Sequence, residues 1–81
     1  MEPYLILARS ITCAQRMQRV LGRGGLRCQI SRAPRTLTDL GCAYVVGLET
    51  NDIGGVILLL QKEGLEPLGV FRRGGQEVTL R

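Results

Sequence analysis

Residues 4–25, YLILARSITCAQRMQRVLGRGG, decide how the fold begins. The apolar run 4–8 has the length of a strand and is typical of a strand at the centre of a sheet. Ser10 is a favourable helix N-cap, because its hydroxyl can accept a hydrogen bond from an amide of the first turn. The glycines within 22–25 end this helix, since glycine readily adopts the left-handed conformation that follows a helix. Between these limits, apolar residues three and four positions apart predict one buried face: Ile11, Ala14, Met17 and Leu21.

A second strand is indicated over 27–32, where Cys28 and Ile30 alternate with polar residues. A loop follows over 33–41, opened by a proline and closed by a glycine, and the apolar run 43–48 predicts a third strand.

The second half of the chain repeats the helix and strand. Residues 50–52, TND, offer cap residues for a helix that ends at Gly64, and 68–72 predicts a fourth strand. Gly54 and Gly55 weaken the first turn of this helix, by about 1 kcal/mol each relative to alanine. Its expected buried face consists of Ile53, Val56, Ile57 and Leu60.

The order βαββαβ predicts an α+β fold, a ferredoxin-like sandwich with a four-stranded antiparallel sheet and two helices on one face. We expect a single domain over 1–81 with its core in 4–72, and either a tail or a short additional strand over 74–81. Apolar side chains on the other face of the sheet then need cover, and Leu58 has no evident partner on its helix. Such apolar surface is typical of self-association, which makes a homo-oligomer one expectation.

Composition and charge exclude several classes of protein. The longest apolar run, 56–60, is far shorter than a membrane span, and the opening residues do not follow a signal-peptide pattern, so we expect a cytoplasmic protein. Eleven Lys and Arg residues against seven Asp and Glu give a net charge of +4, which favours anionic partners. The arginines are scattered and aromatic residues amount to 4%, however, which argues against a nucleic-acid binder.

The three cysteines, Cys13, Cys28 and Cys42, form no CxxC pair, and the chain has no histidine. The common zinc patterns and histidine-based catalysis are therefore missing, and we expect neither a metal nor an organic cofactor. Cys28 is interpreted as a core residue. Cys13 is either buried at the edge of its helix or a second thiol, and Cys42 is either a packed residue or a functional one.

The predicted topology favours one place for chemistry. The first strand ends, the first helix begins and the third strand begins at the same edge of the sheet, so we expect Cys42 near Ser10, Thr12 and Cys13. Free amides and the helix dipole stabilise a thiolate at such a helix end. Two further residues complete the candidate binding set: Arg35, which adds positive charge, and Gly41, which leaves room around the sulfur.

Three stretches make the chain resemble a known family: 4–21, the segment PRTLTDLGCAY at 34–44, and LGVFR at 68–72. The family comprises small bacterial selenium/sulfur carrier-like proteins, whose domain is also found fused to sulfur-carrier modules. The family's cysteine falls on Cys42, although in some members it stands at the position of Gly41. The resemblance implies that Cys42 carries sulfur or selenium as a persulfide or selenosulfide, received from a donor such as a cysteine desulfurase and passed to an acceptor protein.

A carrier of this kind is a co-substrate rather than an enzyme with turnover of its own. The alternative is an oligomeric ligand-binding or protein-interaction module in which Cys42 is structural. Thiol reactivity distinguishes the two, because only the carrier needs an accessible thiolate at position 42.

Overall fold

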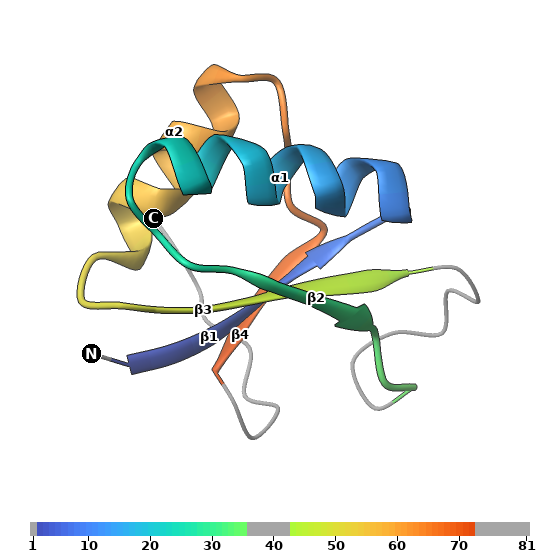
Figure 1. Ribbon diagram of the computed structural model, residues 1–81. Helices are drawn as coiled ribbons and strands as arrows, with labels where there is room; N and C mark the ends of the chain where they lie inside the picture. The colour runs from blue at the N-terminus through green and yellow to red at the C-terminus, as the bar shows by residue number, and fades with distance from the viewer. Residues whose placement is uncertain (1, 36–42, 73–81) are drawn as a thin grey trace.

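The computed structural model describes residues 2–35 and 43–72, which form four strands and two helices (Figure 1). The elements follow in the predicted order, and the ends of the strands differ from the predicted ones by at most two residues. They are β1 (Glu2–Ala8), α1 (Ile11–Arg23), β2 (Gln29–Arg32), β3 (Tyr44–Thr50), α2 (Ile53–Lys62) and β4 (Gly69–Arg72).

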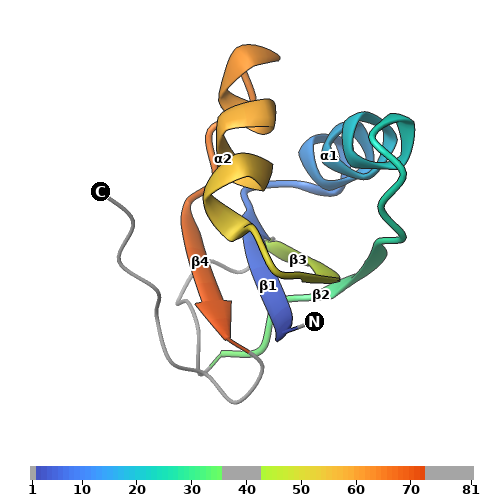
Figure 2. The same cartoon turned by 90° about the vertical axis from the view of Figure 1, so that its left-hand side faces the viewer.

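The four strands form one antiparallel sheet in the order β2-β3-β1-β4. The longest pairing joins the two central strands, from Glu2 opposite Thr50 to Ala8 opposite Tyr44. Figure 2 shows both helices on the same face of the sheet. The predicted ferredoxin-like α+β arrangement is therefore confirmed.

Both helices begin at a predicted cap. The hydroxyl of Ser10 accepts from the amide of Cys13 over 3.1 Å, and the carboxylate of Asp52 accepts from the amide of Gly55 over 3.0 Å. Each bond satisfies one of the amides that a helix leaves free in its first turn.

Both helices also end in the same way, with a glycine in the left-handed conformation. Gly25 has φ 88° and Gly64 has φ 73°. At each end, the amide of the following leucine donates to a carbonyl five residues back: Leu26 to Leu21, and Leu65 to Leu60. This is the Schellman arrangement, in which the paired leucines also turn their side chains toward the core.

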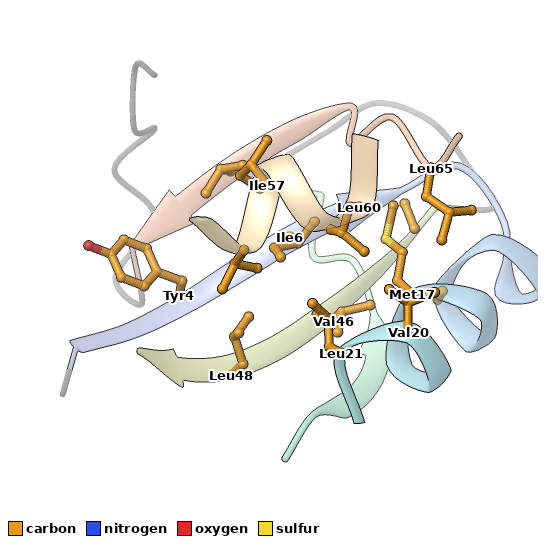
Figure 3. Packing of buried hydrophobic residues seen from close by; sticks show 14 residues of the cluster. Tyr4, Ile6, Met17, Val20, Leu21, Val46, Leu48, Ile57, Leu60 and Leu65 are labelled. Carbon is orange, nitrogen blue, oxygen red and sulfur yellow. The ribbon is translucent and has the colours of Figure 1, made fainter. Parts of the chain in front are cut away.

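The main core lies between the sheet and the two helices (Figure 3). Alternate residues of the central strands face it, among them Ile6 and Val46, which are 0% exposed. Helix α2 contributes the predicted Val56, Ile57 and Leu60, with Ile53 packed at the margin. Helix α1 contributes Ala14, Met17, Val20 and Leu21.

The prediction that Ile11 of α1 lies in the core is wrong. Ile11 is 39% exposed, whereas Val20, which is outside the predicted face, is buried. Side chains on a helix lean toward its N-terminus. The side chain of Ile11, the first residue of α1, therefore extends beyond the helix instead of over the sheet.

The opposite face of the sheet also differs from expectation. Leu7, Ala43, Val45 and Phe71 are buried there as a second apolar cluster, so these side chains do not form the exposed surface expected to promote self-association. Leu58, by contrast, is 61% exposed, as predicted. Neither of the described helices has the length and hydropathy that a membrane crossing requires.

Candidate functional site

Three element ends meet at one edge of the sheet. Ala8, the last residue of β1, pairs with Tyr44, the first residue of β3, and α1 begins three residues after Ala8. The predicted juxtaposition of these ends is therefore confirmed. It follows from the antiparallel register of two neighbouring strands rather than from any local sequence signal.

The start of α1 is built to accept negative charge. The first turn contains no acidic residue, and Arg9 lies just before the cap Ser10. The hydroxyl of Ser10 accepts a hydrogen bond from the amide of Cys13, and the carbonyl of Ser10 accepts one from the amide of Ala14 over 3.0 Å. The remaining amides of the first turn and the positive end of the helix dipole favour an anion here.

A hollow of about 320 Å³ lies against this helix start. Three predicted binding residues, Ser10, Thr12 and Cys13, line it together. Sequence reasoning missed the other lining residues, since the connection after α2 reaches this place only through tertiary packing. These are Arg9, Arg16, Gly64, Leu65 and Glu66.

The two cysteines of the described chain have different surroundings. Cys13 is a free, half-buried thiol that packs against the core and also lines the hollow. Cys28 is free and half-buried, and desolvation raises the pKa of its thiol above the ordinary value. Its carbonyl also accepts from Nε2 of Gln18 over 2.8 Å. The placement of Cys28 against the core agrees with its predicted packing role, and its raised pKa disfavours a reactive thiolate.

Of the other predicted site residues, Arg35 lies within the part of the chain that the structure describes. Arg35 is exposed in the turn after β2. The amide of Ala33, two residues earlier, donates to the carbonyl of Ala43 over 3.0 Å and so continues the pairing of β2 with β3. Gly41 and Cys42 lie outside the described residues, so their predicted roles stay predictions.

A larger hollow of about 490 Å³ lies elsewhere, where the connection from α1 enters β2 and β3 approaches its end. None of the predicted site residues that the structure describes lines it. Its lining is mixed in polarity and includes Arg27, Gln29, Gly47 and Glu49.

Comparison with known proteins supports the resemblance noted in the sequence. The chain matches the model of the family described as putative Se/S carrier protein-like over residues 3–72, and it belongs to that family. No curated protein matches the chain. No solved structure matches it either.

Proposed function

We propose that this protein carries sulfur or selenium on the thiol of Cys42. The observation that carries the proposal is the pairing of Ala8 with Tyr44, which brings the start of β3 to the start of α1. In the sequence, Cys42 directly precedes Ala43, which is followed by β3. Membership in the Se/S carrier-like family supports a carrier role for the chain.

The electrostatics of the helix start support a thiolate in this region. The dipole of α1 and the guanidinium groups of Arg9 and Arg16 all favour negative charge near the hollow. Arg35 of the turn after β2 is the further positive group of the proposed site, and Gly41 is the residue that leaves space beside the sulfur.

The proposed loading step conserves atoms and electrons. The Cys42 thiolate attacks the outer sulfur of a donor persulfide, the donor S–S bond breaks, and the donor cysteine leaves as a thiolate. The product is a persulfide on Cys42, and a selenium atom in the outer position yields the corresponding selenosulfide. The step requires no metal, organic cofactor or separate oxidant, because the transferred atom arrives already oxidised in the donor persulfide.

The partners in this proposal are the donor and the acceptor of the atom, both proteins, with a cysteine desulfurase as one class of donor. A cytoplasmic location and a single domain over 1–81 belong to the same proposal. Among the described residues, the exposed large apolar side chains support self-association; they are Ile11, Leu58 and Leu68.

The alternative function is a ligand-binding or interaction module with a structural Cys42. The hollow of about 490 Å³ favours it, since this hollow has the size of a small-molecule site and its described lining residues include no cysteine. This alternative predicts an unreactive thiol at position 42.

The test measures alkylation rate against pH for the wild type and for Cys13→Ser, Cys28→Ser and Cys42→Ser. We expect Cys42 to react at the lowest pH and, after treatment with a low-molecular-weight persulfide, to gain the mass of one sulfur atom in intact-mass analysis. The Cys42→Ser variant should lose this adduct, while Cys28→Ser should keep it. A Cys42 thiol that is no more reactive than a free cysteine would contradict the carrier and support the module.

A further inference from the structure

A groove runs along α1, with the helix on one side and the connection 63–66 on the other. It consists of two adjoining hollows of about 130 and 320 Å³, which share Arg16 and Leu65 as lining residues. We call this feature the arginine groove, because four arginines line it: Arg9, Arg16, Arg19 and Arg23. Figure 1 shows the connection that follows α2 on its way down to β4.

The helix side of the groove carries positive charge that its own helix does not neutralise. Helix α1 contains Arg16, Arg19 and Arg23 and no acidic residue, so it lacks the oppositely charged pairs that usually balance a solvated helix face. Arg23 forms an exposed ion pair with Glu63 at 3.1 Å. Within residues 2–35 and 43–72, Arg9, Arg16 and Arg19 form no ion pair or side-chain hydrogen bond.

The spacing of these arginines matches a helical repeat. Arg16, Arg19 and Arg23 stand three and four positions apart, so they form one row about 10 Å long at 1.5 Å per residue. The lining beneath the row is partly apolar, with Val20 and Leu65 buried at 8% and 3% exposure.

The opposite side of the groove decides which class of anion fits. Glu63 and Glu66 line that side and are both exposed. A nucleic-acid backbone, with a phosphate at every step, would meet these two carboxylates, and no aromatic side chain lines the groove for base stacking. A protein segment can instead place carboxylates against α1 and apolar or basic side chains against the connection.

We propose that the arginine groove binds an acidic segment of a partner protein, with carboxylates spaced to meet Arg16 and Arg19. One end of the groove is the start of α1, so a partner seated there is held beside the edge where β3 begins. The identity of the partner as sulfur donor or acceptor rests on the proposed function, whereas the charge and shape of the groove do not.

The test uses a fluorescently labelled peptide whose glutamates repeat the spacing of the three α1 arginines in an alanine background. Binding is measured by fluorescence anisotropy at low salt. We expect Arg16→Glu and Arg19→Glu to weaken binding by about tenfold or more, because each places like charge against the peptide. Glu66→Gln should strengthen it. The matched control, Arg27→Glu, has the same change in net charge at an exposed site outside the groove and should change affinity by less than about twofold.

Three further measurements make the test decisive. Thermal unfolding of each variant shows whether it still folds. The variant Arg19→Gln keeps a long polar side chain and removes only the charge, so a loss of binding in this variant is a loss of charge. Cys42→Ser should bind the peptide as the wild type does, so a failed carrier function and a failed groove are told apart. The proposal is overturned if the wild type does not bind the peptide, if Arg27→Glu weakens binding as much as Arg19→Glu, or if a single-stranded oligonucleotide binds the groove more tightly than the peptide.

Discussion

The hydroxyl of Ser10 and the amide of Cys13 form a 3.1 Å hydrogen bond at the start of α1. This contact joins two features of the molecule, because Ser10 caps the helix and Cys13 carries a thiol that lines the adjacent hollow. The residue that fixes where the helix begins therefore also helps to set the electrostatic surroundings of the candidate site.

Replacing Ser10 by alanine removes this cap. We expect Ser10→Ala to lower the free energy of unfolding by about 1 kcal/mol, because the amide of Cys13 loses its protein acceptor. Urea unfolding followed by circular dichroism measures the change. The matched control is Ser31→Ala on the exposed side of β2, for which we expect a change below about 0.5 kcal/mol. Equal losses in the two variants would mean that the cap contributes nothing specific.

The two glycines at the start of α2 should respond oppositely to alanine. A Cβ on Gly54 approaches Asp52 no closer than 3.9 Å, so Gly54→Ala should raise the free energy of unfolding, by up to about 1 kcal/mol. A Cβ on Gly55 would collide with the carboxylate of Asp52, which must then move and give up its bond to the Gly55 amide. We therefore expect no gain from Gly55→Ala, and a clear gain in chemical denaturation would show that the cap is dispensable.

A second pair of glycines tests the ends of the helices. Gly64 has φ 73°, so Gly64→Ala should destabilise the protein by about 1 kcal/mol even though a Cβ there meets no atom within 4 Å. Gly22 lies inside α1, where an added Cβ would likewise meet no atom within 4 Å, and Gly22→Ala should stabilise by about 0.5–1 kcal/mol. Thermal unfolding of both variants checks the contrast. Stabilisation by both would mean that the left-handed conformation at Gly64 is not required.

Local chemistry explains which parts of the fold could be predicted. The caps at Ser10 and Asp52 and the helix-ending glycines act within one or two turns, so the sequence pattern indicates them directly. The sequence pattern also suggests that Gly55 only weakens α2, whereas the structure shows that a larger residue there would require the capping carboxylate of Asp52 to move.

The features that could not be predicted depend on contacts between distant segments. Nothing near Arg16 in the sequence indicates that Leu65 and Glu66 face it across a groove. The burial of Leu7 and Phe71 on the second face of the sheet likewise depends on tertiary packing, which strand alternation alone does not predict. The meeting of β1, α1 and β3 could be deduced in advance, because the topology dictates it.

Stability should fall at alkaline pH because of Cys28. Burial raises the pKa of its thiol in the folded state, so the unfolded chain releases this proton first as the pH rises. The contribution of Cys28 is thus fully present below the unfolded pKa of about 8.5 and is lost as the pH rises through the higher folded pKa. Urea unfolding across this range should show the decline.

Two variants identify the groups responsible for that decline. The substitution Cys28→Ala should reduce the slope of the free energy of unfolding against pH in the first part of the decline, whatever the change in absolute stability. The Tyr4 hydroxyl donates to Glu2 over 2.8 Å, and this bond together with burial raises the pKa of Tyr4, so Tyr4→Phe should flatten the part at higher pH. An unchanged slope in Cys28→Ala would show that the thiol of Cys28 is not responsible.

The substitution Ser10→Asp separates the structural role of the cap from its electrostatic one. Aspartate caps helices as well as serine does, so the free energy of unfolding should change little. The added carboxylate lies beside the hollow, however, and like charge disfavours a thiolate, so alkylation of the Cys13 thiol should become slower. Alkylation rates, read residue by residue through mass spectrometry, measure this change. Cys28 does not line this hollow, and its carbonyl is bound by the side chain of Gln18 in the second half of α1, so it serves as the internal control. If the proposed site is correct, alkylation of Cys42 should become slower together with that of Cys13. A change at Cys13 alone would mean that the thiol of Cys42 does not share the start of α1, and the proposed electrostatic activation of Cys42 would have to be abandoned.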